Sequence, residues 1–168
     1  MAAHPMPFRA NGSVHVQLPP DGRQSEAALA IRRGVCRRLR AEGYCLIPEL
    51  TLASGRRADL AAVGRGGEIV LVEIKSSVTD FRADGKWPIY LRHADLFYFA
   101  TAPEVPQAIF PAETGLIVAD SYGAEIVRPA PAARLAPATR KQMLILIARA
   151  GAARLHDLED PEAGRGAA

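Results

Sequence analysis

The sequence has few of the residues from which zinc sites and disulfide frameworks are built. Its 168 residues include only two cysteines and four histidines. Cys36 and Cys45 lack the close paired spacing of zinc and redox motifs, and His15, His93 and His156 lie far apart without ligand spacing. We therefore expect no structural zinc, and we expect both cysteines to be small buried residues in a reducing compartment.

Long apolar runs are also missing. Residues 1–12 contain no stretch typical of a signal peptide, and no later segment is long enough to span a bilayer. We expect a cytoplasmic protein without membrane contact.

A large excess of charge of one sign is also missing. The 21 basic and 18 acidic residues leave a net charge of +3, which permits contact with a polyanion but does not indicate it. The hydrophobic content of 49% is enough for the core of one compact domain.

What the sequence does contain is an alternation of helix and strand patterns. A first helix is predicted from a capping pattern at Asp21 and Gln24 to about Glu42, before Gly43. Its buried stripe is predicted to consist of Ala28, Ile31, Val35 and Leu39. Outside this stripe, Arg33, Arg37 and Arg40 are expected to be either solvated or in contact with phosphate.

Six strands are predicted further along the chain, at residues 44–52, 57–63, 68–75, 96–100, 116–119 and 124–128. A helical excursion over residues 79–92 is expected to be interrupted at Pro88. An alanine- and proline-rich connector at 129–137 precedes an amphipathic helix that opens at Thr139. We expect one domain over residues 21–156, with flexible segments at 1–20 and 157–168.

The glycine loop at residues 64–67 allows the register of two strands to be predicted. A hairpin centred on Gly66 places Asp59 opposite Glu73. Glu73 and Lys75 lie two residues apart on one strand and share a face, and directly opposed residues have Cβ atoms ~5 Å apart. Three charged groups should therefore converge. A loop off by one residue would make Asp59 a diagonal neighbour of Glu73 or turn it to the other face of the sheet.

Such a convergence is the chemistry of a divalent-metal site. Two close carboxylates resist joint ionisation unless a hard cation lies between them, so we expect Mg²⁺ or, alternatively, Mn²⁺, with the carbonyl of Ile74 completing the shell. The cation would lower the pKa of a bound water for phosphodiester hydrolysis, and Lys75 would orient or activate that water. An acid and a lysine at this spacing often form only an exposed ion pair. Here Glu73 and Lys75 continue the face of Ile69 and Leu71 on a strand fit for burial, where charges are costly unless they act together.

The segments RADL at 57–60 and VEIKS at 72–76 resemble the signature of the PD-(D/E)XK nuclease superfamily, with Ala58 in place of the proline before Asp59. More specifically, EIKSSVTDF, DGKWPIY and HADLFYFA within residues 72–100 are similar to the MmcB-like DNA repair proteins of bacteria. The likeness covers roughly residues 25–155. It implies an α/β fold, with a restriction-endonuclease-like mixed β-sheet flanked by helices, and a role in DNA repair. It also implies metal binding by Asp59 and Glu73 and a catalytic role for Lys75.

The same resemblance maps the acid that many relatives carry in the first helix to Glu26, although a favourable charge at a helix start explains this residue equally well. Trp87 is expected either to stack on bases or, by packing, to brace a helix over the metal. The candidates for DNA contact are Lys86, Trp87, Arg92 and Arg57.

The expected function is Mg²⁺-dependent hydrolysis of DNA in repair, with DNA and other repair proteins as partners. The alternative is a catalytically inactive module that binds DNA or acts as a scaffold in a repair pathway. An α/β enzyme acting on small molecules lacks support, because no phosphate-binding glycine pattern follows a strand and opens a helix. The loop at Gly64 joins two strands instead.

Overall fold

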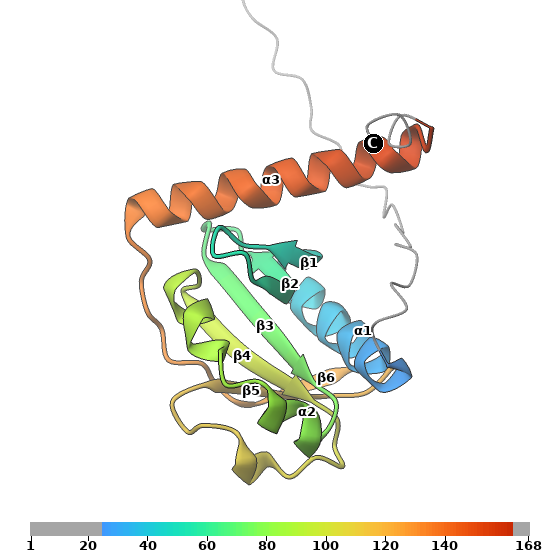
Figure 1. Cartoon of the computed structure of the whole chain (residues 1–168), viewed down its shortest axis with the longest axis vertical. Coiled ribbons are helices and arrows are strands. Elements are labelled where there is room, and N and C mark those ends of the chain that lie inside the picture. Colours follow the sequence, from blue (N-terminus) through green and yellow to red (C-terminus); the bar gives the residue numbers. More distant parts are fainter. Residues whose placement is uncertain (1–24, 163–168) are drawn as a thin grey trace, which may run out of the picture.

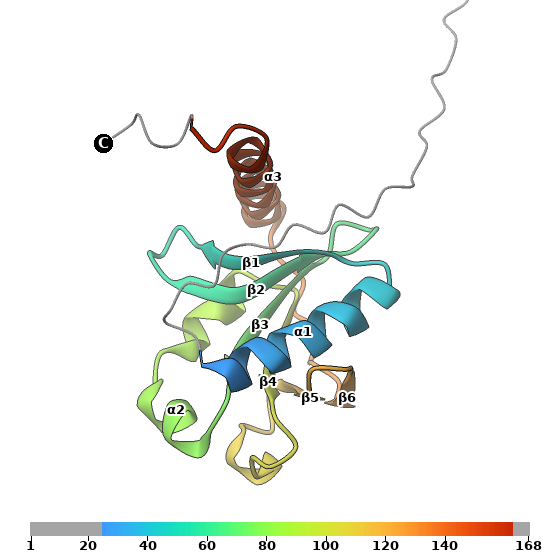
Figure 2. The same ribbon diagram turned by 90° about the vertical axis from the view of Figure 1, so that its right-hand side faces the viewer.

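The computed structural model describes residues 25–162, which form a six-stranded sheet with helices packed against it (Figures 1 and 2). Two short 3₁₀ helices are labelled η. The elements in chain order are α1 (Glu26–Ala41), β1 (Cys45–Thr51), β2 (Arg57–Val63), β3 (Ile69–Lys75), α2 (Val78–Ala83), η1 (Trp87–Arg92), β4 (Leu96–Thr101), η2 (Gln107–Ile109), β5 (Gly115–Ala119), β6 (Ala124–Arg128) and α3 (Pro137–Glu159). Within this range no helix combines the length and apolar character needed to cross a bilayer.

The strands lie in the sheet in the order in which they occur in the chain. β1, β2 and β3 pair antiparallel, β3, β4 and β5 pair parallel, and β6 returns antiparallel to β5. The sheet is therefore mixed and flanked by helices, and the predicted fold class is confirmed. β3 lies near the middle and is buried along its whole length, which makes its charged end the unusual part of the strand.

Each face of the sheet has its own apolar core. On one face, α1 lies along the sheet (Figure 2) and packs its stripe of Ile31, Val35 and Leu39 against Val70 and Val72 of β3. On the other face, β3 contributes Ile69 and Leu71 to a core that also contains aromatic residues and the inner side of α3. The aromatic members include Tyr90, Phe97, Phe99 and Phe110. Because side chains alternate along a strand, Glu73 and Lys75 lie on this aromatic face.

The predicted helix boundaries need three corrections. The N-cap of α1 is Ser25, whose hydroxyl accepts a hydrogen bond from the amide of Ala28, while the predicted cap at Asp21 and Gln24 lies outside the described residues. The break in the helical excursion falls at residues 84–86, and Pro88 instead lies in the first turn of η1, where no amide is needed. α3 begins at Pro137, two residues before the predicted start at Thr139, and continues to Glu159.

Two side-chain predictions are also corrected. Cys45 is exposed and Cys36 is half-buried, so the expectation of two buried cysteines is wrong for Cys45. Arg37, predicted to be either solvated or bound to phosphate, donates hydrogen bonds to the carbonyls of Ser121 and Tyr122 at 2.9 and 3.1 Å. It thereby ties α1 to the turn between β5 and β6.

Candidate metal centre

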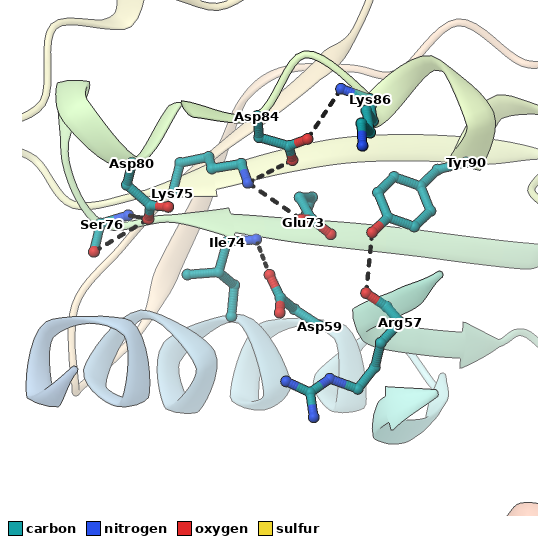
Figure 3. Close-up of polar contacts among 10 residues, drawn as sticks. All are labelled: Arg57, Asp59, Glu73, Ile74, Lys75, Ser76, Asp80, Asp84, Lys86 and Tyr90. Atoms are coloured by element: carbon teal, nitrogen blue, oxygen red, sulfur yellow. Dashed lines mark hydrogen bonds and ion pairs between the residues drawn. The ribbon is translucent and has the colours of Figure 1, made fainter. Parts of the chain in front are cut away.

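The pairing of β2 with β3 places Asp59 beside the end of β3. Leu60 pairs with Val72 and Ala61 with Leu71, which is the register predicted from the glycine loop. Regular pairing ends at Leu60. Beyond it, the Asp59 carboxylate accepts a hydrogen bond from the Ile74 amide at 2.7 Å (Figure 3). Asp59 thus meets β3 through its side chain, at the position next to Glu73, and its charge acts on Glu73.

Glu73 and Lys75 are buried at the end of β3, with relative exposures of 7% and 4%. The Lys75 ammonium donates to Glu73 Oε1 at 3.2 Å and to Asp84 Oδ2 at 2.7 Å (Figure 3). Asp84 directly follows α2. The backbone at this point is held by Thr101 of β4, whose hydroxyl donates to the carbonyl of Lys75 at 2.7 Å. The end of the strand therefore presents its two charges from a fixed position.

A further carboxylate, Asp80, lies in the turn that follows β3. The Ser77 hydroxyl accepts from the amide of Asp80 at 3.1 Å, and the Asp80 carboxylate accepts from the amide of Ser76 at 3.0 Å. The Ser77 cap, together with the Asp80 carboxylate that accepts from the residue before this cap, fixes the start of α2 next to the site. The negative charge of Asp80 is one of the influences that raise the pKa of Asp59.

Negative charge at the site is only partly compensated. Burial, and then the charge of Asp59, raise the pKa of Glu73 to about 8, although Lys75 acts in the opposite direction. Burial also raises the pKa of Asp59, against the hydrogen bond from the Ile74 amide. Among residues 25–162, Glu73 Oε2 is a buried oxygen without a hydrogen-bond partner. A buried acceptor without a donor is costly and calls for an explanation.

A divalent cation fits this arrangement. It would supply the ligand that Glu73 Oε2 lacks and the positive charge that two neighbouring carboxylates need to ionise together. Asp59 and Glu73 would be its ligands. In the described part of the chain, no three side chains of Asp, Glu, His or Cys are grouped as a metal site. Two carboxylates from the protein, with the remaining positions left to water or substrate, suit Mg²⁺ better than zinc.

Tyr90 of η1 forms part of the wall of this centre. Its hydroxyl donates to the carbonyl of Arg57 at 3.0 Å, on the side of Glu73 (Figure 3). Burial raises the pKa of Tyr90, and the charges of Glu73 and Asp59 raise it further. The hydroxyl therefore stays protonated and is a neutral donor beside two acids.

The remaining predicted site residues are placed less directly. Glu26 is exposed at the start of α1, and no hydrogen bond or ion pair links it to Asp59, Glu73 or Lys75 within residues 25–162. The amide of Ile74 binds Asp59, so metal binding by its carbonyl stays a prediction.

Among the candidates for DNA contact, Trp87 has a packing role. It stacks on Phe97 with ring centroids 5.9 Å apart and an interplanar angle of 12°. Lys86 and Arg92 are exposed on η1 or next to it. Arg57 forms an ion pair with Glu49 at 3.5 Å. These three basic residues lie at the surface, as phosphate contact requires.

Two members of the site, Asp80 and Asp84, were not predicted. A signal for Asp80 was present, because Ser77 followed three residues later by an acid is a helix-start pattern. This pattern predicts that Asp80 lies in the first turn of a helix, but it does not predict that Asp80 lies near Asp59. Asp84 had no such signal, since its contact with Lys75 depends on where the chain goes after α2.

Comparisons with known proteins agree with the resemblance seen in the sequence. A family model described as DNA repair protein MmcB-like matches residues 16–162. A solved structure, described as the SPO1766 protein of unknown function from Silicibacter pomeroyi, is 45% identical with a TM-score of 0.79, and the match covers 82% of this chain and 94% of that one. No curated protein matches the chain.

Proposed function

The chain belongs to the MmcB-like family of DNA repair proteins, and from that membership we propose that it hydrolyses DNA phosphodiester bonds at a Mg²⁺ site of the PD-(D/E)XK type. The observation that carries the proposal is the state of Glu73. This carboxylate is buried, has an oxygen without a partner among the described residues, and has a pKa raised to about 8 beside Asp59. A structural acid would have its oxygens bonded, so the arrangement is that of a site prepared for a ligand.

Asp59 and Glu73 are the residues that would hold the cation. When bound, Mg²⁺ supplies a Lewis acid for a phosphate oxygen and lowers the pKa of a coordinated water. The Ile74 amide fixes the orientation of the Asp59 carboxylate. Glu73 must lose its proton to become a ligand, so protons and metal compete for it at pH values below about 8.

Lys75 acts as a fixed positive charge. Burial lowers the pKa of its ammonium, but Glu73 and Asp84 more than offset that effect, so the pKa is raised overall. An ammonium has three donors, and two of them bind Glu73 and Asp84. The third would be available to a phosphate oxygen or to the attacking water. Of the two roles predicted for Lys75, orienting the water and offsetting charge fits this protonation state better than removing a proton.

Basic side chains beside the acids favour DNA as the substrate. Arg57 lowers the pKa of Asp59, and Arg56 lowers that of Asp84, so both guanidinium groups lie close enough to act on the site. With Lys86 on the following loop, they provide positive charge for the phosphates that flank the scissile bond. Phosphate contacts of this kind position a nucleic acid without reading its sequence.

A nuclease screen with purified protein tests the proposal. The substrates are single-stranded, duplex, flapped and branched DNA, each with Mg²⁺, with Mn²⁺ and with chelator. We expect metal-dependent cleavage that is lost in Asp59→Asn and in Lys75→Ala but retained in Glu125→Gln, a control for an exposed acid of β6. Binding of DNA without metal-dependent cleavage of any substrate would overturn the proposal and favour the alternative of an inactive DNA-binding or scaffolding module.

A further inference from the structure

The helix α3 has two apolar faces, and the sheet covers one of them. The inner face buries Met143 against the core. Arg154, near its far end, donates hydrogen bonds to the carbonyls of Pro48 and Glu49 on β1. On the outer face, Ile145 and Leu155 keep 49% and 47% of their surface exposed. The helix lies across one end of the sheet with its outer side turned away from every other described element (Figures 1 and 2).

The outer face has the spacing of a coiled-coil seam. Its residues are separated alternately by four and three positions, which keeps them on one narrow stripe of a helix. They are all exposed, and in order they are Lys141, Ile145, Ala148, Ala152, Leu155 and Glu159. The stripe runs for about 27 Å at 1.5 Å per residue. We call it the α3 seam.

The α3 seams of two antiparallel copies are complementary to each other. Read in opposite directions, Lys141 meets Glu159, Ile145 meets Leu155, and Ala148 meets Ala152. A parallel pairing would instead place Lys141 against Lys141 and Glu159 against Glu159, and like charges at such positions are unfavourable. An interface with two-fold symmetry requires a self-complementary patch of this kind, because both subunits use the same surface.

The surface next to the α3 seam has the shape that this pairing needs. A hollow of about 440 Å³ near the start of α3 is lined by Leu135, Leu144 and Ile145 together with basic side chains. At the other end of the helix, Leu158 is 41% exposed beside Leu155. An antiparallel second copy would bring these two leucines over the hollow. The alanines at the middle of the seam, with Gly151 beside them, allow the two helix backbones to approach closely.

We propose that two copies of this chain associate through their α3 seams as an antiparallel, two-fold symmetric helix pair. The expected affinity is modest. A seam of one helix buries less than the roughly 1,200–2,000 Å² of a standard stable interface, so dissociation in about the micromolar range follows. The inference does not depend on the proposed nuclease function, because the α3 seam and the metal centre share no residue.

Sedimentation equilibrium of the full chain, over about 1 to 300 µM to bracket the expected dissociation constant, tests the proposal. We expect a monomer–dimer equilibrium in the wild type. Leu155→Glu should raise the dissociation constant at least about tenfold, because the substitution acts twice in each symmetric dimer. Gln142→Glu, an exposed position of α3 outside the seam, is the control and should leave the equilibrium unchanged.

A charge exchange tests the direction of pairing. Lys141→Glu and Glu159→Lys should each weaken the dimer, because each creates a like-charge contact. The double variant Lys141→Glu/Glu159→Lys should restore it, since the two charges are then exchanged across the same contact. A wild type that stays monomeric at the highest concentration would overturn the proposal. So would a dimer unaffected by Leu155→Glu, or a double variant no stronger than either single variant.

Discussion

Glu73 and Asp95 are two carboxylates with similarly small exposed surfaces, 7% and 8%, although Asp95 lies nearer the surface of the protein, and they are at opposite ends of β3. Asp95 accepts hydrogen bonds from the amides of Ile69 and Leu135 at 2.8 and 2.9 Å, and Arg140 adds two more at 2.7 and 2.6 Å. Glu73 has Lys75 on one oxygen, and its other oxygen, Oε2, has no hydrogen-bond partner among the described residues, although the Tyr90 side chain lies beside this carboxylate (Figure 3).

The pKa values follow this difference. Burial acts to raise the pKa of Asp95, but hydrogen bonds from Arg140, Ile69 and Leu135 outweigh it, and the pKa is lowered. At Glu73, burial and the charge of Asp59 outweigh the opposing effect of Lys75, and the pKa is raised to about 8. Low solvent exposure alone therefore does not identify a functional acid. What distinguishes the two residues is whether the described part of the protein satisfies the carboxylate: Asp95 has a donor on each oxygen, and Glu73 has a free oxygen that we propose meets a cation.

Replacing Asp59 and Asp95 in turn by asparagine should give the largest difference, which is in the rate of DNA cleavage. Asp59→Asn should lower the rate of DNA cleavage at least about 100-fold, because it removes a charged ligand and leaves the Ile74 amide with a weaker acceptor. Asp95→Asn should leave the rate at 25 °C within a few-fold of the wild type, as Asp95 belongs to the other end of the strand. Initial rates on one substrate compare the two, and an Asp59→Asn enzyme with the wild-type rate would contradict the assignment.

The next largest effect is on thermal stability. Here the substitution of Asp95 should matter more than that of Asp59. Asp95→Asn should lower the melting temperature by about 5 °C or more. The amide cannot accept from every donor around it, and a buried donor left unsatisfied costs about 1–3 kcal/mol. Asp59→Asn should change the melting temperature much less. Thermal unfolding followed by circular dichroism measures both, and equal losses would show that the two acids do not differ in their structural role.

A smaller change is expected in the pH dependence of stability. A carboxyl whose pKa is raised by folding stabilises the protein below its unfolded value near 4.5, and this contribution is lost as pH rises to about 8. In metal-free protein, Glu73→Gln should therefore gain about 3 °C in melting temperature relative to wild type for each pH unit between pH 5 and pH 8. Added Mg²⁺ at pH 8.5 should stabilise the wild type and not the variant. Melting curves that stay parallel across this range would refute the assigned state of Glu73.

The smallest expected effect concerns Asp84, which shares Lys75 with Glu73. Loss of its charge in Asp84→Asn removes one of the influences that raise the pKa of Lys75. The alkaline limb of the pH–rate profile should therefore move to lower pH, while the rate at neutral pH falls less than about tenfold, since Asp84 is partly solvated. A merely structural role would lower the rate equally at every pH, and that result would remove Asp84 from the site.

The parts of the molecule that sequence reasoning predicted well are those decided by short-range geometry. The glycine loop fixes the register of the β2–β3 hairpin, because few residues separate the two strands, and this brought Asp59 and Glu73 together. The alternation of strands and helices led to the mixed sheet. Regular pairing stops at Leu60, one residue before Asp59, so the contact of Asp59 with β3 is made by its side chain on the Ile74 amide.

The parts that were missed depend on contacts between distant segments. Asp95 and Arg140 lie 45 residues apart, and nothing in the local pattern of either indicates the other. The same holds for Asp84, whose contact with Lys75 is made by a loop leaving α2. Pro88 was placed at a helix break although proline is equally suited to a first helical turn, where it is found. The local sequence does not decide between a helix break and a first helical turn at Pro88, because proline is compatible with both.

The most direct test of the metal centre is a titration of metal-free protein with Mn²⁺ at pH 8, followed by electron paramagnetic resonance of the free ion. The wild type should bind one ion per chain, Mg²⁺ should displace it, and Glu73→Gln and Asp59→Asn should each abolish binding while Asp95→Asn binds as the wild type does. Binding that is absent from the wild type, or that survives both substitutions at the end of β3, would contradict the site described here.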